Sequence, residues 1–532
     1  MSLFKTFSNP SSPEPPLEAT SASPATAPDS PTLPVGEGES GHVHVTVSVC
    51  PHCAVAIHTV ATEPPTLCPY CQRPFDRESE DRPIGAPFQP PTEDEVKDRM
   101  KRLYRPFPPI LTALIVGMGL LLLAWTVYLQ FRSLSNFWYQ PLVASYSIIA
   151  GLFVITRFIF AAFYHAPAEQ GYNPTVTVLI PCFNEGEAIR KTIECIFASG
   201  YPEDRLEVVC VNDGSKDDSL SHILAAQTRH PRLVAVDFRK NRGLCHGWTV
   251  GTLLAKGEIM VCIDSDTFVF PGAIHKVVQG FTDPTVGGIS GHCDVENANV
   301  NMLTRMQDVR YYFSYKIMKA AESVFGTVSC LPGCFSAYRR ECVAAVLDSW
   351  LNAKVLGSYG NFADDRSLTN CILRNYKILY DDEAIATTIA PENWRQYTRQ
   401  QARWARSYLR EIWKTGKYIW RKHPVPALSW YAMMWMPIIE PFVMFTALVI
   451  APVSAAFSPY SMGLMGPVDI LFSYLIGVFA ITAAWALHFL YTTGRRWWYG
   501  GFLFTLSYMV FYSWQIYWAL LTLRERKWGT RR

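Results

Sequence analysis

Four long apolar segments constrain the fold of this chain most, because each is long enough to cross a lipid bilayer. They lie in two pairs on either side of a more polar stretch: 108–131 with 141–164, and 428–457 with 468–491. About 20 consecutive apolar residues span the hydrocarbon core of a membrane. The sequence therefore predicts two transmembrane helices in 107–164, two more in 428–491, and a soluble domain over 165–398.

The distribution of basic residues predicts how these segments are oriented. Five Lys and Arg residues at 97–105 precede the first apolar segment, whereas the loop after it carries one Arg. Cytoplasmic loops are enriched in Lys and Arg, so we expect the N-terminus and the soluble domain in the cytoplasm. The last apolar segment, 501–523, has basic residues at both ends. This favours an interfacial or re-entrant helix over 498–523, a cytoplasmic C-terminus, and a multi-pass protein of the plasma (inner) membrane.

Composition restricts the remaining classes of protein. The net charge is only +3, which gives no indication of nucleic-acid binding, and a low charged content of 17 % with 14 % aromatics suits a membrane protein. Residues 1–40 hold almost no large apolar side chains, so we expect a disordered tail. Residues 77–106 read as a polar linker. The cysteines of the soluble domain show no framework spacing, which indicates buried, reduced thiols.

A small zinc ribbon is predicted over 45–76. Two CxxC pairs lie fourteen residues apart and supply four thiolates, Cys50, Cys53, Cys68 and Cys71. Two such pairs complete a tetrahedron around Zn²⁺ with no open position, so this zinc would be structural. A redox pair or unpaired thiols remain the alternative. We hypothesise that the ribbon binds a cytoplasmic protein partner or regulates the rest of the chain.

The soluble domain has the pattern of a doubly wound α/β fold. Short β-branched runs at 176–183, 206–213, 233–238 and 259–266 alternate with helical stretches. This alternation is typical of parallel strands joined by helices. Ligands of such sheets bind at the carboxyl ends of the strands.

Aspartates lie at two of these strand ends. Asp213 ends the second run, and Asp264 and Asp266 end the fourth in an Asp-x-Asp triplet. Two carboxylates at this spacing can flank Mg²⁺ or Mn²⁺, and such an ion can hold a diphosphate as it leaves. A solvated loop is the alternative, but it does not explain acidic residues at both strand ends.

Two further motifs carry candidate site residues. Asp364 and Asp365 precede Arg366 after a Gly-rich turn; either carboxylate can serve as a general base, as an ion-pair partner or as a helix N-cap. Gln400, Arg403 and Trp404 begin a basic, Trp-rich stretch over 399–425 that should lie on the membrane surface. The tryptophan is either an ordinary interfacial residue or a platform for a sugar.

The order of these motifs resembles that of the family 2 processive glycosyltransferases. The motifs follow one another along the chain in this order: VTVLIPCFNE, VNDGS, IDSDT, GTVSCLPGCFSAYRR, ADDRSLTN, QQARWARSYLRE and the terminal WGTRR. The resemblance is to the hyaluronan synthase, chitin synthase and nodulation chitooligosaccharide synthase group, and it covers about 105–532. The ribbon and the N-terminal tail lie outside it.

The resemblance implies a GT-A fold that binds a UDP-sugar, and it assigns roles to individual residues. Asp213 would contact the uracil or ribose of UDP, while Asp266, helped by Asp264, would hold the metal. Asp365, beside Asp364, would be the general base. Arg403 would help UDP leave, and Trp404, in one motif with Gln400, would stack on the acceptor sugar. Gly333 and Cys334 would shape the acceptor site, although Cys334 is as readily an ordinary buried thiol. The segment 524–532 would be a gating tail that closes over UDP through Trp528, Gly529, Thr530 and Arg531.

The motifs depart from this family in two places. Relatives carry Gly-Lys-Arg after the third strand, where this chain has Arg242-Gly243-Leu244-Cys245-His246. Lys240 or Arg242 then substitutes, or the nucleotide contact differs. The base motif begins with Ala363 in place of Gly or Thr.

The resemblance implies a membrane-embedded, inverting, processive β-glycan synthase. It would transfer GlcNAc, alone as in chitin or with a second sugar as in hyaluronan, from a UDP-sugar to a growing polysaccharide and export it. Two alternatives remain open: a single-transfer glycosyltransferase that acts on a lipid, and a catalytically inactive zinc-ribbon membrane adaptor.

Overall fold

The computed structural model describes residues 141–353, 355–357, 364–450 and 467–525. It also describes short strands between 32 and 59 and isolated helical positions at 114–131 and 453. Three predicted features lie outside these residues: the four ribbon cysteines Cys50, Cys53, Cys68 and Cys71, most of the first apolar segment, and the tail from 526 onward.

A ten-stranded mixed sheet forms the centre of the α/β domain, in the order β3-β4-β7-β6-β5-β8-β11-β10-β12-β9. Strands β5 to β8 are parallel, β11 runs antiparallel to both of its neighbours, and β10 is parallel to β12. The strands are β5 (Val176–Cys182), β6 (Leu206–Asn212), β7 (Leu233–Asp237), β8 (Ile259–Cys262), β9 (Thr267–Val269), β10 (Val286–Val295), β11 (Ser336–Arg339) and β12 (Lys377–Thr388). The predicted strands and their parallel pairing are thus confirmed.

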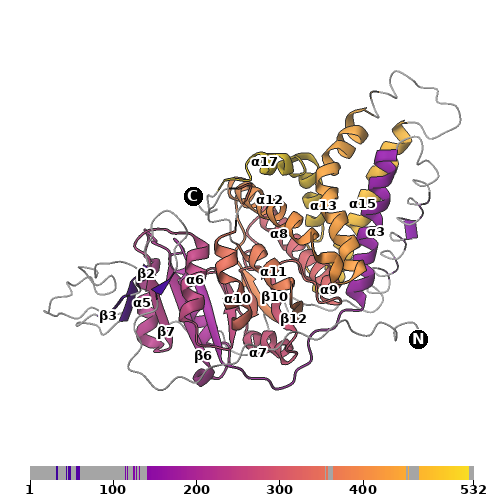
Figure 1. The fold of residues 1–532 in the computed structure, drawn as a ribbon. Helices are drawn as coiled ribbons and strands as arrows, with labels where there is room; N and C mark the ends of the chain where they lie inside the picture. The colour runs from indigo at the N-terminus through magenta and orange to yellow at the C-terminus, as the bar shows by residue number, and fades with distance from the viewer. Residues whose placement is uncertain are drawn as a thin grey trace.

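Helices cover both faces of this sheet because each strand is apolar on both sides. Val178 and Ile180 of β5 belong to one core, and Leu179 between them belongs to the other, as the pleat requires. Helices α4 (Ala188–Phe197), α5 (Ser219–Arg229) and α7 (Ala273–Val278) pack into the first core. Helices α6 (Leu244–Leu254), α10 (Arg340–Leu351) and α11 (Asp365–Leu373) pack into the second (Figure 1).

The N-terminal strands join the edge of this sheet. Strands β3 (Thr46–Val49) and β4 (Ala56–Thr59) form an antiparallel hairpin within the predicted ribbon. Strand β4 pairs in parallel with β7, with Thr59 opposite Asp237. A separate pair, β1 (Thr32–Leu33) with β2 (Val43–His44), places two residues of the predicted disordered tail in a strand. The described strands of the ribbon region therefore lie against the catalytic sheet and do not reach away from it.

Long helices extend from the other side of the molecule. Helices α3 (Pro141–Ala162), α13 (Pro424–Phe445) and α15 (Pro467–Thr493) run close together (Figure 1). Within the described residues, two segments are long and apolar enough to cross a membrane, Ser145–Ala162 and Leu475–Thr493. The third predicted span falls on α13 and the π-helix η6 (Thr446–Ile450), which are not among them. The four-span topology stays a prediction.

The last apolar segment is broken into three short pieces. These are α16 (Gly500–Ser507), the π-helix η7 (Tyr508–Tyr512) and α17 (Gln515–Leu521). Helix α16 packs on α8 (Met302–Tyr312), and α17 packs on α12 (Trp394–Gly416). The remaining short elements are η2 (Glu203–Arg205), η3 (Gln279–Thr282), η4 (Phe313–Lys319), α9 (Ala320–Ser323) and η5 (Ile419–Arg421).

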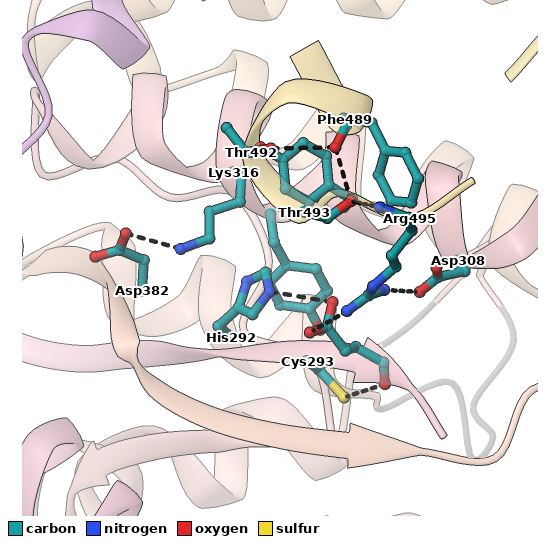
Figure 2. A network of polar contacts seen from close by, with 12 residues as sticks. His292, Cys293, Asp308, Lys316, Asp382, Phe489, Thr492, Thr493 and Arg495 are labelled. Carbon is teal, nitrogen blue, oxygen red and sulfur yellow. Dashed lines mark hydrogen bonds and ion pairs between the residues drawn. The ribbon is translucent and has the colours of Figure 1, made fainter. Parts of the chain in front are cut away.

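A buried ion network joins the end of the long apolar helix α15 to the sheet (Figure 2). Arg495 follows α15 and bridges Asp308 of α8 (2.5 Å) and Asp294 of β10 (3.0 Å). His292 lies 3.4 Å from Asp294, and its other ring nitrogen is 2.7 Å from the hydroxyl of Tyr380 on β12. Burial lowers the pKa of His292, so this ring is neutral at pH 7 and Arg495 supplies the positive charge.

Replacing Arg495 with Met should destabilise the protein by about 3–5 kcal/mol, because it leaves two buried carboxylates without their cation. The apparent melting temperature of the detergent-purified protein measures this loss. Arg496→Met is the matched control, since Arg496 is exposed and should change stability by less than about 0.5 kcal/mol. Equal shifts in melting temperature for Arg495→Met and Arg496→Met would show that the network does not hold α15 against α8 and β10.

Candidate active site

Asp213 lies directly after β6 and holds the loop that follows β7. Its Oδ1 accepts a hydrogen bond from the backbone N–H of Arg242 (2.7 Å), and its Oδ2 accepts one from Gly243 (2.9 Å). Burial raises the pKa of this carboxyl to about 6, although both hydrogen bonds act in the opposite direction. Asp213 thereby fixes the loop that departs from the family pattern.

That loop keeps positive charge without the Lys-Arg pair of the relatives. Cys245 is buried in helix α6, whereas Lys240 and Arg242 are exposed next to Asp213. Gly243 has a φ of +93°, in the left-handed region that favours glycine, and its turn leads into α6. Lys240 and Arg242 are thus two of the cationic side chains that this loop offers to an anionic ligand.

Asp264 and Asp266 occupy the turn between β8 and β9. Both are partly exposed, and the Thr388 hydroxyl donates to Oδ1 of Asp266 at 3.4 Å. Desolvation, followed by the charges of Asp266 and Asp365, raises the pKa of Asp264 to about 7. Desolvation raises the pKa of Asp266 to about 6. Carboxylates crowded in this way are stabilised by a cation.

Gly333 joins the Asp-x-Asp turn to the second acidic motif. Its backbone N–H donates to Oδ2 of Asp365 at 3.2 Å. A Cβ atom at this position would lie 2.7 Å from Oδ1 of Asp264, so a side chain cannot be added without displacing that carboxylate. The loop before β11 is held in place by the neighbouring Leu331, whose N–H donates to Thr369 of α11 at 2.9 Å.

The two adjacent aspartates have different environments. Asp364 is the N-cap of α11, where its carboxylate accepts from the backbone of Ser367 at 2.8 Å and the Ser367 hydroxyl accepts from the backbone of Asp364. Asp365 begins the helix and points to Gly333. Desolvation, then the charge of Asp364, raises the pKa of Asp365, while Arg366 and Arg403 oppose the shift. The N-cap alternative therefore applies to Asp364, and Asp365 faces the Asp-x-Asp turn.

Arg403 of α12 supplies positive charge to this cluster. Burial lowers the pKa of its guanidinium, and the carboxylates of Asp365, Asp264 and Asp364 oppose that shift. Three segments far apart in the sequence thus bring Asp264, Asp365 and Arg403 within electrostatic reach of one another. Gln400 lies one turn before Arg403 on the same helix, which begins at the N-cap Asn393.

Trp404 lies among residues that the sequence did not single out. The ring of Tyr311 on α8 is 6.5 Å from the indole, and the guanidinium of Arg310 lies over the indole at 5.3 Å. Neither Tyr311 nor Arg310 belongs to a recognisable sequence motif. Helix α8 also shows no strong amphipathic pattern that would single them out. Trp404 is only partly exposed, which differs from a tryptophan that lies freely on a membrane surface.

The structure gives less support to two predicted features of the site, Cys334 and the C-terminal tail. Cys334 is 6 % exposed, belongs to the core beneath the sheet and lies 3.0 Å from the hydroxyl of Tyr315, which favours a buried thiol. Trp528, Gly529, Thr530 and Arg531 lie outside the described residues. The segment that leads to them is held on α12, where Arg406 pairs with Glu525 at 2.9 Å and Arg410 donates to the carbonyl of Leu523 at 2.7 Å.

Sequence comparisons identify similar glycosyltransferases. Residues 177–347 match the profile of glycosyl transferase family 2. The hyaluronan synthase of Streptococcus pyogenes is 26 % identical over 396 residues, which cover 73 % of this chain and 91 % of that protein. The N-acetylglucosaminyltransferase of Mesorhizobium japonicum is 30 % identical over 279 residues, 51 % of this chain and 65 % of that protein.

Among solved structures, a mannosyltransferase from Pyrobaculum calidifontis in complex with GDP-Man and Mn²⁺ has a TM-score of 0.49 and 22 % identity, over 72 % of this chain and 99 % of that one. The matched family region contains β5 to β8, the Asp-x-Asp turn and the Gly333 loop. The expected mixed, mostly parallel sheet is present, and the family match supports the expected glycosyltransferase class. The chain thus contains a glycosyl transferase family 2 domain and is similar to hyaluronan synthases and N-acetylglucosaminyltransferases.

Proposed function

We propose that this glycosyltransferase is a membrane-embedded, inverting, processive β-glycan synthase. It transfers GlcNAc, with or without a second sugar, from a UDP-sugar to a growing polysaccharide and exports the product. The observation that carries this proposal is the convergence of Asp264, Asp365 and Arg403 around Gly333. One cluster then provides a cation site, a general base and a positive charge for the leaving group, which an inactive adaptor does not need.

The carboxylates of Asp264 and Asp266 fit a divalent cation such as Mg²⁺ or Mn²⁺. These ions prefer oxygen ligands, and Mg²⁺ in particular takes several of them from phosphates and water. Within the described part of the chain, no group of three or more His, Cys, Asp and Glu side chains is arranged to hold a metal by itself. A two-carboxylate site completed by the substrate is consistent with this. When bound, the cation would neutralise charge on the diphosphate.

The protein side chains would carry out the transfer as a single displacement. Asp365 takes the proton of the acceptor hydroxyl as that oxygen attacks the anomeric carbon of the donor. The bond from this carbon to UDP breaks, and Arg403 stabilises the negative charge on UDP. Attack from the face opposite UDP inverts the configuration from α to β. Asp364 caps α11 and thereby fixes Asp365, while Trp404 stacks on the acceptor sugar.

Interaction with lipid and export rest on the helices next to this site. Trp413, Trp420 and Trp435 are 45–57 % exposed on α12, η5 and α13, and tryptophan is enriched at membrane surfaces. We propose that α3, α13 and α15 lie in the plasma (inner) membrane with the catalytic half and both termini in the cytoplasm. The proposal includes three further features: structural Zn²⁺ at the four ribbon cysteines, a protein partner that binds the ribbon, and closure of the C-terminal tail over UDP.

UDP release by the detergent-purified protein tests the activity. UDP-GlcNAc, UDP-GlcUA, UDP-Glc and the GlcNAc/GlcUA pair are supplied with Mg²⁺ or Mn²⁺. We expect release with UDP-GlcNAc and a loss of about 100-fold or more in Asp365→Asn, because a general base contributes 10²–10⁴-fold. Asp204→Asn, an exposed change in the same domain, is the control.

The products of that assay separate the alternatives. A chitinase-sensitive polymer from UDP-GlcNAc alone indicates a chitin-type enzyme, and polymer from the pair alone indicates a hyaluronan-type enzyme. Transfer of one sugar to a lipid would contradict processivity. Folded wild-type protein that releases no UDP from any donor would contradict the proposal.

Affinity for Mn²⁺ should rise with pH. The pKa values of Asp264 and Asp266 are raised to about 7 and about 6, so below these values the cation must displace protons. Between pH 5.5 and pH 7 we expect about tenfold tighter binding per unit for each displaced proton, then a plateau. Electron paramagnetic resonance of free Mn²⁺ measures the affinity, with Asp266→Asn as the weakened control. Binding that does not change over this range would place the cation elsewhere.

Gly333→Ala should reduce kcat/KM by about 10-fold, because the added Cβ would lie 2.7 Å from Oδ1 of Asp264 and shift that carboxylate. Initial rates with the preferred donor measure the loss. Gly416→Ala is the matched control, since its Cβ would make ordinary contacts of 3.7–3.8 Å. Full activity of the Gly333 variant would show that the close contact is not required.

A further inference from the structure

Arg310 connects three elements of the chain at the Trp404 side chain. Arg310 lies near the C-terminal end of α8, Trp404 lies on α12, and Phe504 lies on α16. The guanidinium carbon is 5.3 Å from the centre of the indole ring and 5.1 Å from the centre of the Phe504 ring. Arg310 therefore contacts two aromatic rings at once, one from the site and one from the C-terminal apolar region.

Hydrogen bonds fix the orientation of this guanidinium. Nη1 of Arg310 donates to Oε1 of Gln401 at 2.5 Å and to the hydroxyl of Tyr397 at 3.3 Å. Gln401 lies one turn before Trp404 on α12, and residues at this spacing share a helix face. Arg310 thus contacts the helix at two points, the amide of Gln401 and the indole of Trp404. Two contacts on one face restrict both the position of the indole and the approach of α12 to α8.

We propose that Arg310 is a positioning residue for the acceptor: it covers one face of the Trp404 indole and holds the ring so that a sugar stacks on the opposite face. This inference rests on the proposed role of Trp404 in acceptor binding. A planar guanidinium can stack on a ring while its N–H groups donate in the same plane, whereas the ammonium of Lys cannot do both. Because Phe504 packs on the same guanidinium, the platform is also tied to α16.

The position of the indole then determines how well the acceptor binds, but not how the donor binds. Donor contacts are proposed at Asp213, Asp264 and Asp266, which lie on other segments. Loss of Arg310 should therefore raise the KM for acceptor and leave the KM for donor nearly unchanged. A residue that only stabilises the fold would lower the active fraction and leave both KM values as they were.

The experiment uses full-length protein in detergent with UDP-GlcNAc as donor and N-acetylchitotetraose as added acceptor. For Arg310→Met we expect the acceptor KM to rise by about 5- to 30-fold, the range that corresponds to a desolvated cation–π contact and its hydrogen bonds. Arg310→Lys should fall in between, because it keeps the charge without the stacked plane. Arg305→Met is the matched control, since Arg305 lies on the same helix and contacts Tyr499 instead of the Trp404 helix.

A double-mutant cycle with Trp404→Ala separates this inference from the proposed function. If Arg310 acts through the indole, Arg310→Met should add almost nothing in the Trp404→Ala background. If Trp404→Ala leaves the acceptor KM unchanged, the sugar-stacking role of Trp404 fails and this inference falls with it. If Trp404→Ala raises the acceptor KM but Arg310→Met and Arg310→Lys do not, the role of Arg310 alone is overturned. Equal changes in the donor and acceptor KM, or additive effects of the two substitutions, also overturn it.

Discussion

The burial of neighbouring carboxylates at the strand ends is the constraint on which the site depends. Desolvation, followed by the charges of Asp266 and Asp365, raises the pKa of Asp264 to about 7. Two features of the chain keep this arrangement folded: the backbone N–H of Gly333 donates to Asp365, and Arg403 approaches from α12. Helix α12 must therefore pack beside α11 for this cluster to form. The proposed catalytic chemistry depends on that contact.

A second pairing of charges lies close by, at the end of β10, where Val295 pairs with Thr388, whose hydroxyl contacts Asp266. Arg495 enters a buried site between Asp294 and Asp308 and ties the end of α15 to β10 and α8. Helix α8 also carries Arg310, which contacts Trp404. Helix α8 thus contacts both the residue that follows the apolar helix α15 and the proposed acceptor platform, Trp404. Two cation–carboxylate clusters near the same strand ends thus connect the sheet to α12 and to α15.

The parts of the site that follow from local pattern could be predicted from the sequence. The apolar runs of β5, β6 and β8 identify buried strands, and their ends place Asp213, Asp264 and Asp266 at one edge of the sheet. The docking of Gly333 between Asp264 and Asp365 could not be predicted, because it depends on β11 entering the sheet antiparallel beside β8. Long-range pairing of this kind leaves no periodic signal in a single sequence.

Charge patterns in the sequence do not reveal which charges make contacts. Arg495 and Arg496 are adjacent in the sequence, but Arg495 is buried between two carboxylates and Arg496 is exposed. Arg310 left no signal, since its partners Gln401, Trp404 and Phe504 lie about 90 to 190 residues further along the chain.

In the N-terminal region, too, the sequence predicts a local structure but not its long-range contact. Its cysteine spacing predicts a self-contained zinc ribbon, yet the described strand β4 pairs with β7, where Thr59 lies opposite Asp237. Asp237 accepts a hydrogen bond from Asn212 at 2.7 Å, and Asn212 directly precedes Asp213. Edge strands of a sheet expose unpaired backbone groups that invite pairing, and the edge at β7 is covered in this way by the chain's own N-terminal hairpin. The region outside the family resemblance is therefore joined through one strand to the side of the sheet that carries the proposed nucleotide contact.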